Sequence, residues 1–112
     1  MTSFRVRKEQ RYRESVPVQY LGEGVTGEGF LFDLSLNGGR IVGEVPVSVD
    51  LSLRLRFSLP GEAEPFMFER AVVRWVRGLE FGLELGPLPP NRAERFSKVI
   101  DVLVEKHHRS TP

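Results

Sequence analysis

The sequence of 112 residues contains no cysteine, only two histidines and a single tryptophan. Without cysteine the chain has no disulfide framework, no thiolate metal site and no cysteine nucleophile. No stretch approaches the roughly 18 uninterrupted apolar residues of a membrane span, and the N-terminal residues lack the apolar core of a signal peptide. These absences predict a cytoplasmic protein without membrane insertion.

Motifs of the common enzyme classes are also missing. The sequence has no His-Glu-x-x-His, no Gly-x-Ser-x-Gly and no Gly-x-x-x-x-Gly-Lys. The two histidines, His107 and His108, stand beside each other near the C-terminus without a third ligand nearby. They therefore indicate neither a catalytic pair nor a metal site. We expect a protein that is not an enzyme and that needs no metal or cofactor.

The charge of the chain is balanced overall but unevenly distributed. With 16 basic and 15 acidic residues, bulk charge does not favour DNA or RNA as a partner. Residues 1–14 contain five basic and two acidic residues, for a net charge of +3, whereas residues 15–112 carry −2. We expect a flexible basic N-terminal arm over residues 1–14, followed by one folded domain over residues 15–112.

A period of two dominates the folded domain and predicts antiparallel strands. The predicted strands lie near residues 16–20, 25–34, 40–42, 51–59, 66–76 and 79–85. Gly27 and Gly29 predict a bulge or bend in the second strand, and a register shift is expected near Ala71 in the fifth. Six strands with one buried face predict an all-β fold in which an antiparallel β-barrel carries one C-terminal helix.

The C-terminal segment has helical rather than strand periodicity. Asn91 is a good N-cap residue, and Glu94 follows at the spacing of a capping box, which predicts a helix over about residues 91–108. The apolar residues of this helix fall on one stripe, which comprises Phe96, Val99, Ile100, Leu103 and Val104. We expect the helix to cover a mouth of the barrel or to offer this stripe to a partner.

Two polar clusters contain the residues that could bind a ligand. One lies in the basic arm and includes Arg7 and Arg11; the other ends the second strand and includes Asp33, Ser35 and Gly38. Guanidinium groups offer paired donors that match a phosphate or the O6/N7 edge of guanine. A carboxylate and a hydroxyl can accept hydrogen bonds from guanine N1–H and N2–H, and glycine lets a bulky ligand approach the backbone closely. Together the clusters indicate a site for an anionic, guanine-bearing ligand.

The pattern Arg7-x-x-x-Arg11 followed by Asp33-x-Ser35-x-x-Gly38 resembles the PilZ domain family, whose signature is RxxxR and then (D/N)xSxxG. The resemblance covers nearly the whole chain, because the later strands and the C-terminal helix fit as well. It implies a small β-barrel that binds the bacterial second messenger cyclic di-GMP. On this resemblance, the two arginines would hold phosphates and guanine edges. The aspartate and the serine would accept from a guanine base, and the glycine would give the ligand room.

Further residues near the two motifs are candidates for the same site. Lys8 stands where many members of the family carry a second arginine; it keeps the charge but loses the planar fork. Gly39 would let the backbone approach the ligand. Arg13 and Arg40 could assist, although a solvated surface position is the favoured interpretation for both. Trp75 is interpreted as a core aromatic residue rather than as part of a ligand face.

The resemblance implies a stand-alone cyclic di-GMP receptor. Binding would order residues 5–14 against the barrel and change a surface that a separate effector protein reads, in motility, exopolysaccharide or virulence control. One alternative is a PilZ-like protein–protein interaction module that does not bind nucleotide. Another is a single-stranded nucleic-acid binder on an OB-like barrel. It is less favoured because the segment 51–59 places its arginines on one face with serines, whereas its Phe57 points to the apolar side.

Overall fold

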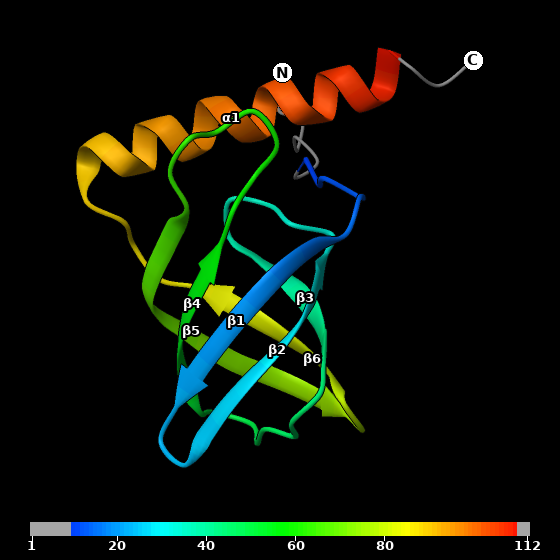
Figure 1. Cartoon of the computed structure of the whole chain (residues 1–112), viewed down its shortest axis with the longest axis vertical. Helices are drawn as coiled ribbons and strands as arrows, with labels where there is room; N and C mark the ends of the chain where they lie inside the picture. Colours follow the sequence, from blue (N-terminus) through cyan, green and yellow to red (C-terminus); the bar gives the residue numbers. More distant parts are fainter. Residues whose placement is uncertain (1–9, 110–112) are drawn as a thin grey trace, which may run out of the picture.

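The computed structural model describes residues 10–109, which form six strands and one helix. These elements are β1 (Val16–Gly22), β2 (Val25–Phe32), β3 (Gly38–Gly43), β4 (Ser52–Phe57), β5 (Phe66–Arg77), β6 (Glu80–Leu85) and α1 (Pro90–Arg109). The strands close into an antiparallel barrel in the order β1-β2-β3-β6-β5-β4 (Figure 1). The fold class predicted from the sequence is therefore confirmed.

Side chains that alternate along the strands fill the interior of the barrel. In β4, Leu53, Leu55 and Phe57 are buried, whereas Arg54 and Arg56 face solvent. This alternation follows from the strand geometry, in which successive side chains point to opposite faces of the sheet. Burying a side chain of this size stabilises the fold by about 1.5–3 kcal/mol relative to leaving it exposed. The apolar period of the sequence thus fixes which face of each strand points inward.

Helix α1 lies across one end of the barrel (Figure 1). The ring of Phe96 packs edge-on against Phe66 and Phe68, with centroid distances of 5.2 and 5.3 Å. The apolar stripe of the helix therefore covers a barrel mouth, which is one of the two uses expected for it. No helix within residues 10–109 is long and apolar enough to cross a membrane.

The start of α1 differs from the prediction. The helix begins at Pro90, and the first turn is closed by a 2.8 Å hydrogen bond from the Ala93 amide to the Pro89 carbonyl. Asn91 lies inside this turn and is not the N-cap. Proline is well suited to the first helical position, because its fixed φ matches the helix and its missing N–H would have no partner there.

The strand registers confirm one irregularity and exclude another. Pairing between β1 and β2 runs without a shift past Gly27 and Gly29, so of the bulge or bend predicted there, the bulge is absent from this pairing. The shift expected near Ala71 is present, because Ala71 pairs with Leu53 while Phe68 pairs with Leu55. A second shift, not predicted, separates Val73 from Trp75 where β5 pairs with β6. Both shifts lie in the longest strand.

Candidate functional site: a polar corner at the start of β3

Tyr12 ties the N-terminal segment to the barrel. Its amide donates to the Leu34 carbonyl at 2.8 Å, and the Leu34 amide donates back at 3.1 Å. The Tyr12 side chain is buried among the core residues, and this burial, together with the charge of Glu14, raises the pKa of Tyr12. Tyr12 therefore belongs to the barrel, although the charge pattern of the sequence predicted a flexible arm over residues 1–14.

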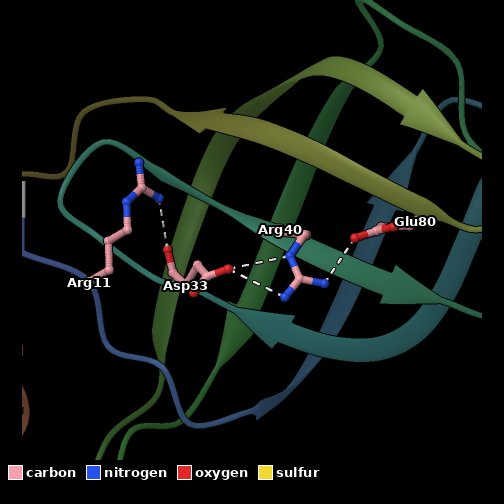
Figure 2. Close-up of polar contacts among 4 residues, drawn as sticks. All are labelled: Arg11, Asp33, Arg40 and Glu80. Carbon is pink, nitrogen blue, oxygen red and sulfur yellow. Dashed lines mark hydrogen bonds and ion pairs between the residues drawn. The ribbon is translucent and has the colours of Figure 1, made fainter.

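This anchor brings Arg11 to the corner that follows β2. Arg11 Nη1 donates to the main-chain carbonyl of Asp33 at 3.4 Å (Figure 2). Of the basic cluster predicted from the sequence, Arg11 thus lies beside the second motif. Arg7 and Lys8 lie outside the described residues.

Asp33 has an unusual backbone conformation, and its side chain is hydrogen-bonded to Arg40. Its φ of 55° is in the left-handed region, which ends β2 at Phe32 and turns the chain toward β3. Its Oδ2 accepts from Arg40 Nε at 3.4 Å and from Arg40 Nη2 at 3.3 Å. Arg40 Nη1 donates to Glu80 Oε2 at 2.9 Å, and its guanidinium lies 4.8 Å from the centre of the Phe32 ring. Arg40 is thus held in a network and is not the solvated residue favoured from the sequence.

Apart from the tyrosines, Ser35 is the only buried side chain with a polar group among the residues that the structure describes, with 1% of its surface exposed. Its hydroxyl donates to the Gly38 carbonyl at 3.3 Å and accepts from the Asn37 amide at 3.2 Å. The Ser35 amide also donates to the Gly38 carbonyl at 2.8 Å. These bonds stabilise the turn between Asp33 and β3, because a serine hydroxyl can hydrogen-bond to main-chain groups of neighbouring residues.

The two glycines at the start of β3 lie close to neighbouring strands. A Cβ at Gly38 would lie 2.2 Å from the Leu83 carbonyl oxygen on β6. A Cβ at Gly39 would lie 2.9 Å from a methyl group of Leu31, inside the barrel. From the sequence, both glycines were expected to allow close approach of a ligand. In the structure, close approach of the chain itself already requires glycine at position 38 and leaves little room for a side chain at position 39.

A hollow of about 230 Å³ lies beside this corner. Its lining comprises Arg11, Ser35, Asn37, Gly38, Gly39, Arg74, Trp75, Gly82, Leu83 and Glu84. Trp75 is 40% exposed, so its interpretation as a core residue is wrong. The indole ring packs against the main chain at Gly82 on the outer face of the barrel. A Cβ at position 82 would collide with the ring.

Arg74 is the functional candidate that the sequence motifs did not indicate. Its Nε and Nη2 contact Glu84 Oε1 at 2.8 and 2.7 Å, and its Nη1 lies 4.0 Å from Asp50. The side chain lines the same hollow as Arg11 and Trp75. The only signal in the sequence was its position next to the single tryptophan.

The closed barrel, the covering helix and the polar corner joined to the N-terminal segment define a small β-barrel domain with a surface site. The sequence pattern of the PilZ domain family matches residues 5–101, and the chain belongs to this family. None of the curated proteins compared matches the sequence.

One similar solved structure is the inhibitor of motility MotI/DgrA from Bacillus subtilis, with a TM-score of 0.70 and 19% sequence identity. The similarity covers 97% of this chain and 55% of that one, so this chain spans about half the length of its structural neighbour. At this identity the likeness shows the fold.

Proposed function

We propose that this protein is a receptor for cyclic di-GMP and not an enzyme. The observation that carries the proposal is the contact between Arg11 and the Asp33 carbonyl, which joins the two halves of the PilZ signature at one corner of the barrel. The hollow beside that corner combines two arginines, an exposed aromatic ring and glycine backbone, which are groups that suit a purine nucleotide.

The proposed roles follow from chemistry and position. Arg11, with Arg7 carried over from the family signature, holds phosphate oxygens through its paired N–H groups. Asp33 accepts from guanine N1–H and N2–H while its Oδ2 stays bonded to Arg40, because a carboxylate has room for about four acceptor contacts. A purine stacks on the exposed face of Trp75. Ser35 contributes by shaping the turn, since its hydroxyl is already bonded within it.

The size of the hollow limits how the ligand is held. At about 230 Å³ it is smaller than the roughly 300–1,000 Å³ of pockets that enclose drug-sized ligands. One base of the dinucleotide would occupy it, and the rest of the ligand would lie on the open surface. A ligand held in this way changes the exposed surface around Arg11 and Trp75, which a separate effector protein could read in motility, exopolysaccharide or virulence control.

Calorimetric titration of the full chain with cyclic di-GMP tests the proposal, with GTP and GMP as control ligands. Arg11→Ala should weaken binding by about ten- to a hundredfold, because each charge-assisted hydrogen bond contributes about 1.5–3 kcal/mol. Arg13→Ala is the matched control, since Arg13 is an exposed arginine two residues away that does not line the hollow. Absence of binding by the unmodified chain at high ligand concentration would reject the receptor function and favour the protein–protein interaction module.

A further inference from the structure

A second and larger hollow, here called the outer hollow, lies over β1, β2, β3 and β4. Its volume is about 660 Å³, and it does not include Arg11, Asp33 or Trp75. The exposed side chains of Phe30 and Val42 lie on its lining, at 51% and 41% exposure. Strand pairing places Val42 opposite Phe30. An apolar surface of this kind around a hollow is typical of an interaction site.

Charged residues cross the same face in a fixed order. Glu28 on β2 pairs with Gln19 on β1, and Gln19 pairs with Arg56 on β4. Glu44 joins the row beyond Glu28, because the Glu44 amide donates to the Glu28 carbonyl at 3.1 Å and Glu44 Oε2 accepts from the Glu28 amide at 3.2 Å. The row therefore has two carboxylates at one end, a neutral amide in the middle and a guanidinium at the other end.

The charges at the two ends of this row are not neutralised within the part of the chain that the structure describes. Glu28, Glu44 and Arg56 form no ion pair with any residue between 10 and 109. By contrast Arg54, two residues before Arg56 on the same strand, contacts Glu69 at 3.1 Å. Adjacent strands lie about 4.8 Å apart, so β1 separates Glu28 from Arg56 by roughly 10 Å.

We propose that the outer hollow is the contact surface of a two-fold symmetric dimer of this protein. A two-fold axis that runs along β1 in the plane of contact exchanges the β2–β3 side of one copy with the β4 side of the other. The carboxylates of Glu28 and Glu44 then face Arg56 of the second copy, and this contact is made twice. Such self-complementarity is what an isologous interface requires, and the order of charges along the row provides it.

The shape of the surface agrees with the same axis. Phe30 projects on the β2 side, whereas Ser58 and Pro65 line the outer hollow beyond β1. The exchange carries Phe30 of each copy over the hollow of the other copy. An exposed aromatic side chain that enters a pocket of its partner is a common anchor of protein interfaces. The dimer thereby covers an apolar surface that is open in the single chain.

Sedimentation equilibrium of the full 12.7 kDa chain tests this proposal. The unmodified chain should form a dimer. Arg56→Glu places like charges opposite each other and should weaken the dimer at least about tenfold. Phe30→Ser should weaken it by a similar factor because it removes the anchor. The double variant Glu28→Arg/Arg56→Glu restores opposite charges across the axis and should recover most of the lost affinity.

The control variant distinguishes a specific interface from a general effect of surface charge. Arg54→Glu makes the same charge change on the same strand outside the outer hollow, and it should leave the dimer constant within about twofold. Circular dichroism should show that all four variants remain folded, since each altered side chain faces solvent. A chain that stays monomeric up to about 1 mM would overturn the proposal. A dimer that is unaffected by Arg56→Glu and Phe30→Ser, or one that the double variant does not restore, would also overturn it.

Discussion

Arg40 holds the carboxylate of Asp33 through two of its nitrogen atoms, at 3.3 and 3.4 Å, while its third nitrogen is bonded to Glu80 (Figure 2). The carboxylate that the family signature assigns to the ligand is therefore already oriented by a neighbouring strand. Because both side chains of the pair are about one-third exposed, the pair itself stabilises the fold by no more than about 1 kcal/mol. The main effect of the ion pair is to fix the direction in which the Asp33 carboxylate points.

Arg40→Met should weaken the binding of cyclic di-GMP by about five- to tenfold. The substitution keeps a flexible apolar stem but removes the guanidinium, so Asp33 becomes free to rotate away from the guanine. Titration calorimetry measures the change. Glu80→Gln is the control, because it leaves the contact between Arg40 and Asp33 in place and should alter the affinity by less than about threefold. Equal losses in the two variants would contradict this role for Arg40.

Trp75 should report ligand binding directly. It is the single tryptophan of the chain and lines the hollow beside Arg11, so a guanine stacked on it should quench the intrinsic fluorescence. Trp75→Ala should weaken binding by about five- to a hundredfold, as expected for the loss of one stacked base. Trp75→Phe keeps an aromatic face and should retain more of the affinity. Binding without any change in fluorescence would show that the ligand lies elsewhere.

Gly38→Ala should destabilise the barrel before it affects any ligand. The added methyl group would lie 2.2 Å from the Leu83 carbonyl oxygen, so β3 and β6 must move apart, at a cost of about 2–3 kcal/mol. Gly24→Ala is a useful comparison, because Gly24 has a φ of 73° with open space around it and its replacement should cost about 1 kcal/mol. Urea unfolding measures both values. A folded, fully stable Gly38→Ala variant would contradict this structural role and favour the role predicted from the sequence, in which Gly38 gives a ligand room.

The ion pair between Glu62 and Arg95 predicts a pH dependence of stability. Arg95 Nε donates to Glu62 Oε1 at 2.9 Å, and Arg95 Nη2 donates to Glu62 Oε2 at 2.6 Å. These hydrogen bonds hold the pKa of Glu62 below its usual value. A lowered pKa in the folded state stabilises the fold above the ordinary pKa of about 4.5, and this stabilisation is lost as the pH falls through the lowered value.

Glu62→Gln should therefore reduce the free energy of unfolding at pH 7, and the difference from the unmodified chain should shrink as the pH falls below about 4.5 and through the lowered pKa of Glu62. Urea unfolding at several pH values provides the measurement. The control is Glu64→Gln, since the Glu64 side chain is 79% exposed and its ion pair with Arg92 is long, at 3.8 Å. A difference that persists unchanged at low pH would show that the ionised carboxylate is not its source.

The sequence predicted the barrel because strand alternation depends on local patterns, and Leu53, Leu55 and Phe57 are clear examples. It misplaced Trp75 for a specific reason. Ala71 and Val73 point inward, and an unbroken strand would point Trp75 inward as well, but the register shift after Val73 turns it outward. Such a shift depends on the pairing of β5 with β6 and leaves no local signature.

The candidate site was predictable in its residue types but not in its contacts. The family signature identified Arg11 and Asp33, which the structure brings together. The pairing of Arg40 with Asp33 and Glu80 depends on side-chain conformations across three segments of the chain. The burial of Ser35 depends on how the turn packs against the barrel. Neither can be inferred from spacing along the chain.

The pairing of β4 with β1 has a consequence for how this protein can meet other proteins. Since the six strands between residues 10 and 109 close into one barrel, none of them is an edge strand with a whole row of unpaired main-chain N–H and C=O groups. The described strands therefore offer little main chain with which an extended peptide, or the sheet edge of another copy, could pair. A partner that binds the barrel wall meets mainly side chains, so a single surface substitution can remove one association selectively.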